Sequence, residues 1–148
     1  IERDVFPQLA SEGQLSGVPF EGYFIDAGTP DAWNDAVKAS IEHGRYNTGL
    51  VHGSKPSWFA TEDARVGVSP QAQVEYSMVS EGCTIGQSAV SMSTLLKGAH
   101  VGDNARLVAS LVGQGARIGD GCQLSGVVVD HEAVVPNGTV QNGGSWPS

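Results

Sequence analysis

The residue with the clearest chemical potential is Asp26, in the stretch GYFIDAGTPDAW at residues 22–33. Its carboxylate follows an apolar run and precedes a turn that starts a helix. In α/β proteins, ligands commonly bind at the end of a strand that leads into a helix N-terminus. Two interpretations stay open from the residues alone. Asp26 ligates a cation, or it only caps the turn at Gly28 and Thr29, as aspartate often does.

The histidines and cysteines show no metal-binding spacing. His43, His52, His100 and His131 form neither an HxH nor an HExxH pattern, so they do not indicate a zinc site. Cys83 and Cys122 form no CxxC motif. The simplest interpretation is a pair of buried thiols in a reducing compartment.

Composition excludes two classes of partner. The 148-residue chain has a formal net charge of −8, and no stretch concentrates Lys or Arg. A nucleic-acid-binding surface and an anionic-membrane surface are therefore not expected. No apolar run approaches the roughly 20 residues that span a bilayer.

The first 46 residues are predicted to alternate helix and strand. RDVFPQLASEG has helical spacing, with Pro7 in the first turn, where proline is tolerated. QLSGVPFEGYFIDAG is predicted to form two short strands. TPDAWNDAVKASIEHG is predicted to form a helix with Thr29 as N-cap and Pro30 at the first position. Its inner face would be Trp33, Ala36, Val37, Ser40 and Ile41, and Gly44 would end it.

Residues 47–65 are predicted to be a linker, and a repeat begins at Val66. Apolar residues recur in three columns with steps of 16 or 17 residues, and small or turn-forming residues lie between them. The first column is Val68, Ile85, Val101, Ile118 and Val135. The second is Val74, Val90, Leu107, Leu124 and Val140, and the third is Val79, Leu96, Val112 and Val129.

This pattern predicts a triangular β-solenoid over residues 66–148. One aliphatic residue from each side points inward, and each coil stacks on the last at about 4.8 Å. Several coils are needed because one coil cannot bury its own inner face. The tail NGGSWPS is expected to cap one end, where Trp146 would be either a lid or an exposed aromatic without a specific role.

The repeat resembles the hexapeptide-repeat family, which implies a mainly β fold, a left-handed parallel β-helix. The stretches IERDVFPQLASEGQL and FEGYFIDAGTPDAWNDAV resemble the end of the catalytic α/β domain of sugar-1-phosphate nucleotidyltransferases. Mannose-1-phosphate guanylyltransferases are the closest pattern, and that group commonly carries such a β-helix after this segment. The order of the two parts matches as well.

The resemblance implies a role for each residue of the motif. In the intact enzyme, Asp26 would help to hold Mg²⁺ while a sugar 1-phosphate attacks a nucleoside triphosphate, GTP being favoured, and releases pyrophosphate. Glu2 lies in the family's IERxxFP motif and would either contact substrate or organise the first helix. Gly28, Thr29 and Pro30 would be structural.

The family's glycine-rich nucleotide loop and first metal-binding aspartate are absent from this sequence. The chain is therefore expected to be a C-terminal fragment, inactive alone and with no catalytic residue of its own. The solenoid would serve oligomerisation or regulation in a cytoplasmic homo-oligomer. Two alternatives stay open: a hexapeptide acyltransferase with His100 as base, and a non-catalytic assembly module.

Overall fold

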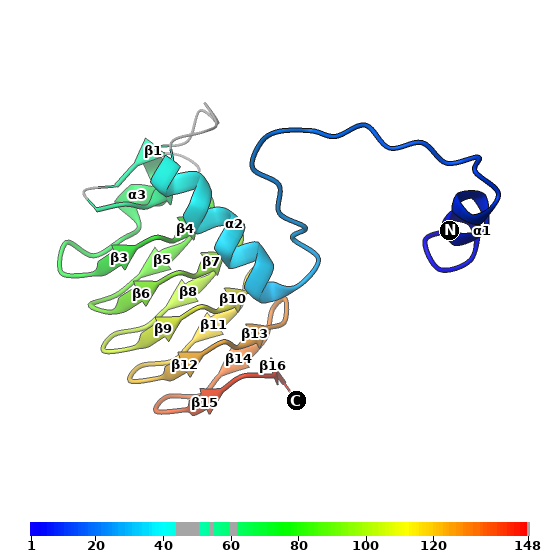
Figure 1. Cartoon of the computed structure of the whole chain (residues 1–148). Coiled ribbons are helices and arrows are strands. Elements are labelled where there is room, and N and C mark those ends of the chain that lie inside the picture. The colour runs from blue at the N-terminus through cyan, green and yellow to red at the C-terminus, as the bar shows by residue number, and fades with distance from the viewer. Residues whose placement is uncertain (44–50, 54, 60–61, 148) are drawn as a thin grey trace.

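A computed structural model describes residues 1–43, 51–53, 55–59 and 62–147, and most of these build one prism of stacked strands (Figure 1). Within these ranges the strands form three sheets, one for each side of the prism. The fold class expected from the sequence is confirmed: the chain is mainly β, and its parallel solenoid is consistent with a left-handed β-helix. In the same ranges, no helix is long and apolar enough to cross a membrane.

Each sheet collects every third strand of the repeat. The longest sheet, here sheet A, contains β1 (Val51–His52), β2 (Trp58–Phe59), β4 (Met78–Val79), β7 (Thr94–Leu95), β10 (Leu111–Val112), β13 (Val128–Val129) and β16 (Ser145–Trp146). Sheet B contains β5 (Thr84–Ile85), β8 (His100–Val101), β11 (Arg117–Ile118) and β14 (Val134–Val135). Sheet C contains β3 (Gln73–Glu75), β6 (Ala89–Ser91), β9 (Arg106–Val108), β12 (Gln123–Ser125) and β15 (Val140–Asn142).

The aliphatic columns fill the interior of the prism. In sheet B, Ile85, Val101, Ile118 and Val135 pair in register on successive strands, and each is almost fully buried. Val68 joins the same column through a parallel bridge to Ile85. Since burial of apolar surface is the main favourable term in folding, these ladders hold the coils together.

Two members of the predicted columns are wrong by one residue. In sheet A, Val79 and Val112 both pair with Leu95, which is fully buried, so Leu96 does not belong to the column. In sheet C, Leu124 pairs with Gln141, while Val140 points outward and is 65% exposed. A shift of one residue moves a strand side chain to the opposite face. In sheet A the two adjacent leucines hide that shift, and in sheet C the inward position holds the polar Gln141.

The corners depend on close backbone approach. A Cβ on Gly119 would lie 2.6 Å from the backbone nitrogen of Asn137. The backbone N–H of Asp120, next to Gly119, donates to Asn137 Oδ1 at 3.0 Å. One coil earlier, the backbone N–H of Asp103 donates to Asp120 Oδ1 at 2.8 Å. The Asp or Asn two residues after each of the last three members of the first column (Asp103, Asp120 and Asn137) therefore forms a ladder that joins successive coils.

Both ends of the prism are covered. At one end, Ala64 of α3 (Glu62–Val66) is fully buried against the core. At the other end, Trp146 packs on the core and its indole N–H donates to the carbonyl of Val134 at 3.0 Å. The Gln141 amide donates to the carbonyl of Gly143 at 3.0 Å. The expected role of Trp146 as a lid is confirmed.

The predicted N-terminal helices form, but the predicted strands between them do not. The helices are α1 (Val5–Ser11) and α2 (Pro30–His43), whereas residues 12–28 contain no strand. Val18 is 91% exposed and Phe24 is 78% exposed. A strand needs a neighbour to satisfy its backbone groups, and no other described segment pairs with this one. The expected helix end at Gly44 lies outside the described residues.

The segment expected to be a linker contains solenoid strands. Trp58 and Phe59 of β2 pair in parallel with β4, and both side chains are buried. β1 adds to β2 in the antiparallel sense. The solenoid therefore begins before Val66, and the division into domains at residues 46 and 66 stays a prediction.

Candidate functional site

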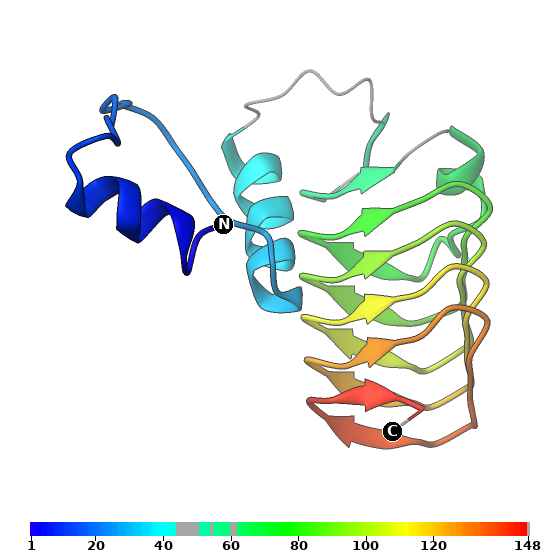
Figure 2. The ribbon, with the colours of Figure 1, turned by 90° about the vertical axis from the view of Figure 1, so that its right-hand side faces the viewer.

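Helix α2 connects the Asp26 segment to the solenoid. It lies along the stack of coils on the outer side of sheet A (Figures 1 and 2). Trp33 Nε1 donates to Thr94 Oγ1 at 3.1 Å, and Thr94 Oγ1 donates to Asn34 Oδ1 at 3.3 Å. Farther along the helix, Lys38 lies over the ring of Tyr76. The N-terminal turn of α2 therefore contacts β7, and its later turns contact the coils nearer β1.

The turn before α2 is built as the sequence predicts. Thr29 Oγ1 accepts a hydrogen bond from the Ala32 backbone N–H at 3.2 Å, which is N-cap geometry, and Pro30 is the first helical residue. The Asp26 carboxylate lies beside Gly28. If Gly28 carried a Cβ, that atom would lie 3.3 Å from Asp26 Oδ1. Gly28 therefore leaves room for the carboxylate, a role that the sequence analysis did not foresee.

The described residues do not fit a magnesium site by themselves. Asp26 is exposed, and within the described ranges no group of three or more His, Cys, Asp or Glu side chains could hold a metal ion. Glu2 lines a shallow surface hollow with Ile1, Arg3 and Asp4. Figure 1 shows α1 set apart from α2, with the extended segment between them. The structure does not bring Glu2 and Asp26 together.

The histidines of the solenoid hold polar contacts and are not clustered. His100 on β8 is half-buried, and its Nδ1 lies 2.6 Å from Thr84 Oγ1 of the preceding coil. His131 Nδ1 accepts a hydrogen bond from the Gln114 backbone N–H at 2.8 Å. Both side chains thus tie one coil to the next. Among the described residues, no contact of His100 with a carboxylate or a second histidine supports its use as a base.

The two cysteines are buried and free. The Cys83 thiol donates to the carbonyl of Leu96 at 3.1 Å, and the Cys122 thiol donates to the carbonyl of Pro136 at 3.1 Å. Burial raises the pKa of Cys83. A buried thiol that stays protonated is a poor nucleophile, so Cys83 serves packing.

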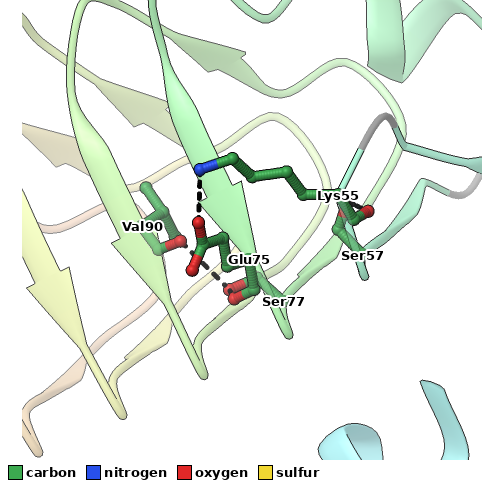
Figure 3. Close-up of polar contacts among 5 residues, drawn as sticks. All are labelled: Lys55, Ser57, Glu75, Ser77 and Val90. Carbon is green, nitrogen blue, oxygen red and sulfur yellow. Dashed lines mark hydrogen bonds and ion pairs between the residues drawn. The ribbon is translucent and has the colours of Figure 1, made fainter. Parts of the chain in front are cut away.

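A ladder of buried serines runs along one corner, and sequence analysis missed it. Each hydroxyl donates to the carbonyl two residues earlier; the four serines are Ser57, Ser77, Ser93 and Ser110. Figure 3 shows the start of this ladder, beside the ion pair between Lys55 and Glu75. The recurrence of serine every 16 or 17 residues from Ser77 onward was a usable signal.

Past the N-terminal end of α2, the outer face of sheet A is not covered by the helix. A groove of about 290 Å³ lies there, and its mainly apolar wall includes Trp33, Leu96, Leu111 and Val128. Leu111 and Val128 are half-buried. The apolar surface that α2 covers at one end of the sheet therefore continues past the helix.

Comparison with known proteins relates both parts of the chain to one class of enzyme. The chain is 30% identical, over 147 residues, to the glucose-1-phosphate adenylyltransferase of Bacillus mycoides (strain KBAB4). It is 31% identical to the enzyme of the same name from Bacillus cereus (strain Q1). Each match covers 93% of this chain and 37% of the relative. The chain thus resembles the C-terminal part of sugar-1-phosphate nucleotidyltransferases, as the sequence analysis expected, and these relatives act on glucose 1-phosphate instead of mannose 1-phosphate.

A family model matches the solenoid, and a solved structure matches half of the chain. The structure is a histidine-to-asparagine mutant of perosamine N-acetyltransferase from Caulobacter crescentus, in complex with CoA and GDP-perosamine. It is 25% identical, covers 50% of this chain and 43% of that one, and has a TM-score of 0.31. The family model, described as GlmU-like, C-terminal hexapeptide, matches residues 58–142. Because this match spans more than half of the chain and coincides with the stacked coils, the protein belongs to the GlmU-like C-terminal hexapeptide family.

Proposed function

We propose that this chain is the C-terminal region of a sugar-1-phosphate nucleotidyltransferase, which forms a nucleotide sugar and pyrophosphate. The observation that supports the proposal is the continuity of the match: it covers 93% of the chain, so it includes the Asp26 segment as well as the solenoid, in the same order. A match confined to the solenoid would indicate only the fold, since one fold supports many functions. The chain spans 37% of the relative's length, so the activity is proposed for a longer protein.

Within that longer protein, the Asp26 turn is the part of this chain that faces the reaction. Phosphoryl and nucleotidyl transfer depend mainly on positioning and on neutralising charge. The exposed carboxylate lies beside Gly28, just before the capped start of α2. Asp26 stays our candidate for one magnesium ligand, with the other ligands supplied from outside the described residues. Glu2 stays a weaker candidate for substrate contact.

The exposed apolar side chains before α2 support the same proposal. Val18, Phe20 and Phe24 are more than two-thirds exposed, although phenylalanine and valine are among the residues most often buried. In a longer protein these residues would pack into an α/β domain, where the predicted strands would find partners. The N-terminal segment would then complete the catalytic domain and the solenoid would follow it.

The substrates form the finer part of the proposal. The names of the relatives favour glucose 1-phosphate and an adenine nucleotide, whereas the sequence motif favoured mannose 1-phosphate and GTP. We place the glucose and adenine pair first, because it comes from matches that cover both parts of the chain. We further propose a cytoplasmic location and a homo-oligomer, whose size light scattering of the longer protein would give.

The direct test is a pyrophosphate-release assay on the longer protein encoded by the reading frame that contains this chain. We expect turnover with ATP and glucose 1-phosphate, and none from the 148-residue chain alone. Asp26→Asn should lower kcat/KM by about 100-fold or more. Asp35→Asn, the same change at an exposed position on α2, is the control and should leave kcat/KM unchanged. If the longer protein shows no activity with ATP and glucose 1-phosphate and none with GTP and mannose 1-phosphate, the proposal is overturned.

A further inference from the structure

Thr94 is a polar residue in an apolar row. On the outer side of sheet A, Met78, Thr94, Leu111 and Val128 occupy equivalent positions on successive coils. Thr94 is fully buried because α2 covers it. An interface built for apolar burial alone would place another aliphatic residue here. The hydroxyl therefore requires an explanation other than packing.

Two consecutive residues of α2 bind this hydroxyl. Thr94 accepts from the Trp33 indole and donates to Asn34 Oδ1. Asn34 is 4% exposed, and its Nδ2 has no hydrogen-bond partner within the described part of the chain. A buried donor without a partner costs stability. The interface thus keeps its polar contact although the unpaired Asn34 amide lowers the stability of the protein.

Apolar packing alone does not fix where α2 lies along the stack. Coils repeat about every 4.8 Å, and a helix turn rises about 5.4 Å. A helix displaced by one coil would therefore present a similar face to a similar surface. The open groove with Leu96, Leu111 and Val128 shows that such a surface continues beyond the helix. A single buried polar contact can choose one register among several, as it does in coiled coils.

We propose that Thr94 is a positioning residue: its contact with Trp33 and Asn34 sets the position of α2 on the solenoid and, through α2, the position of Asp26. Two hydrogen bonds of ordinary net strength favour one register by about 30-fold. The connection to Asp26 is short, because Thr29 caps the helix three residues after Asp26. A slide by one coil would move the Asp26 turn by about 5 Å, whereas a misplacement of about 1 Å can lower rates 100-fold.

The positioning role is tested first on this chain, without any assay of activity. In the double variant Thr94→Val/Asn34→Leu, apolar groups replace the hydroxyl and the amide, which preserves packing and removes the unpaired amide. The Trp33 indole loses its acceptor, but Trp33 is 41% exposed, so its N–H can donate to water. Spin labels at Asp31→Cys and Asn142→Cys, both exposed, report the distance between α2 and the last coil. The native cysteines are buried. We expect one distance in the parent and a second population, displaced by about 5 Å, in the double variant.

The matched control is Thr84→Val, the same change on a sheet that α2 does not cover. It should keep the single distance. A single unchanged distance in the double variant would show that apolar packing alone fixes the helix, and it would overturn the inference. The midpoint of thermal unfolding should stay equal or rise in the double variant, so loss of folding does not explain a second population.

The link to Asp26 rests on the proposed function and is tested in the longer protein. The double variant should lower kcat/KM at least tenfold, and Thr84→Val should leave it unchanged. Unchanged kcat/KM in an active enzyme would overturn the link between Thr94 and Asp26. A longer protein that transfers no nucleotide would instead overturn the proposed function, and the spin-label distances would still decide whether Thr94 sets the register.

Discussion

Replacing Ser93 by alanine tests how strongly the serine ladder stabilises the solenoid. The Ser93 hydroxyl donates to the carbonyl of Ser91 at 2.8 Å and accepts from the Ser110 N–H at 3.0 Å. The side chain is fully buried, so water cannot replace it. Each hydrogen bond contributes about 1 kcal/mol net, and an unpaired buried N–H costs about 1–3 kcal/mol. We expect the free energy of unfolding to fall by about 2–3 kcal/mol.

Urea unfolding followed by circular dichroism measures this loss. The midpoint should fall by roughly 1–1.5 M, with an unchanged slope, if that slope lies near 2 kcal/mol/M. Ser125→Ala is the control, because Ser125 lies on the exposed side of β12, and it should change stability by less than about 0.5 kcal/mol. If Ser93→Ala costs no more than the control, the ladder does not stabilise the fold and the reasoning is wrong.

Three further predictions concern the corners and a buried thiol. Ala109 adopts a left-handed conformation (φ 49°), so Ala109→Gly should raise the free energy of unfolding by about 0.5–1 kcal/mol in the same urea experiment. Gly126 has the same conformation in the next coil (φ 64°), so Gly126→Ala should lower the free energy of unfolding by a similar amount. Gly119→Ala should cost about 1–3 kcal/mol, because its Cβ would collide with Asn137, and the unfolding midpoint should fall accordingly. Burial raises the pKa of Cys83, so above about pH 8.5 the unfolded chain loses a proton that the folded chain keeps, and stability falls as pH rises. Cys83→Ala should reduce that fall between pH 7 and 9.5.

The solenoid was predictable because its signal repeats. Each coil supplies an independent test of the spacing, so the column from Ile85 to Val135 was correct in every member. One error arose where two adjacent residues satisfied the column equally well. Leu95 and Leu96 are both leucine, and the structure alone shows which faces inward. At the last coil, Gln141 replaces the aliphatic residue, so a search for apolar residues selected Val140.

Features that occur once were harder to predict. Strand β2 belongs to the first coil, which has no earlier copy to reveal a period, and its Trp58 and Phe59 were assigned to a linker. The strands expected near Phe20 and Phe24 depend on neighbours that the described part of the chain does not provide. Local patterns predicted both helices and the Thr29 cap, since capping involves only residues within one turn.

The contact that determines the placement of Asp26 was invisible in the sequence for a different reason. Thr94 lies 61 residues from Trp33 and 60 from Asn34, and a threonine on the outer side of a strand is ordinary. Asn34 was also left out of the predicted inner face of α2. Thr94 becomes conspicuous only when the strand register is known, because the residues before and after it in the row, Met78 and Leu111, are apolar, and the next polar residue, Ser145, lies on the last coil and is exposed. In a solenoid, a polar residue that interrupts an outward apolar row therefore indicates where another element is held in register.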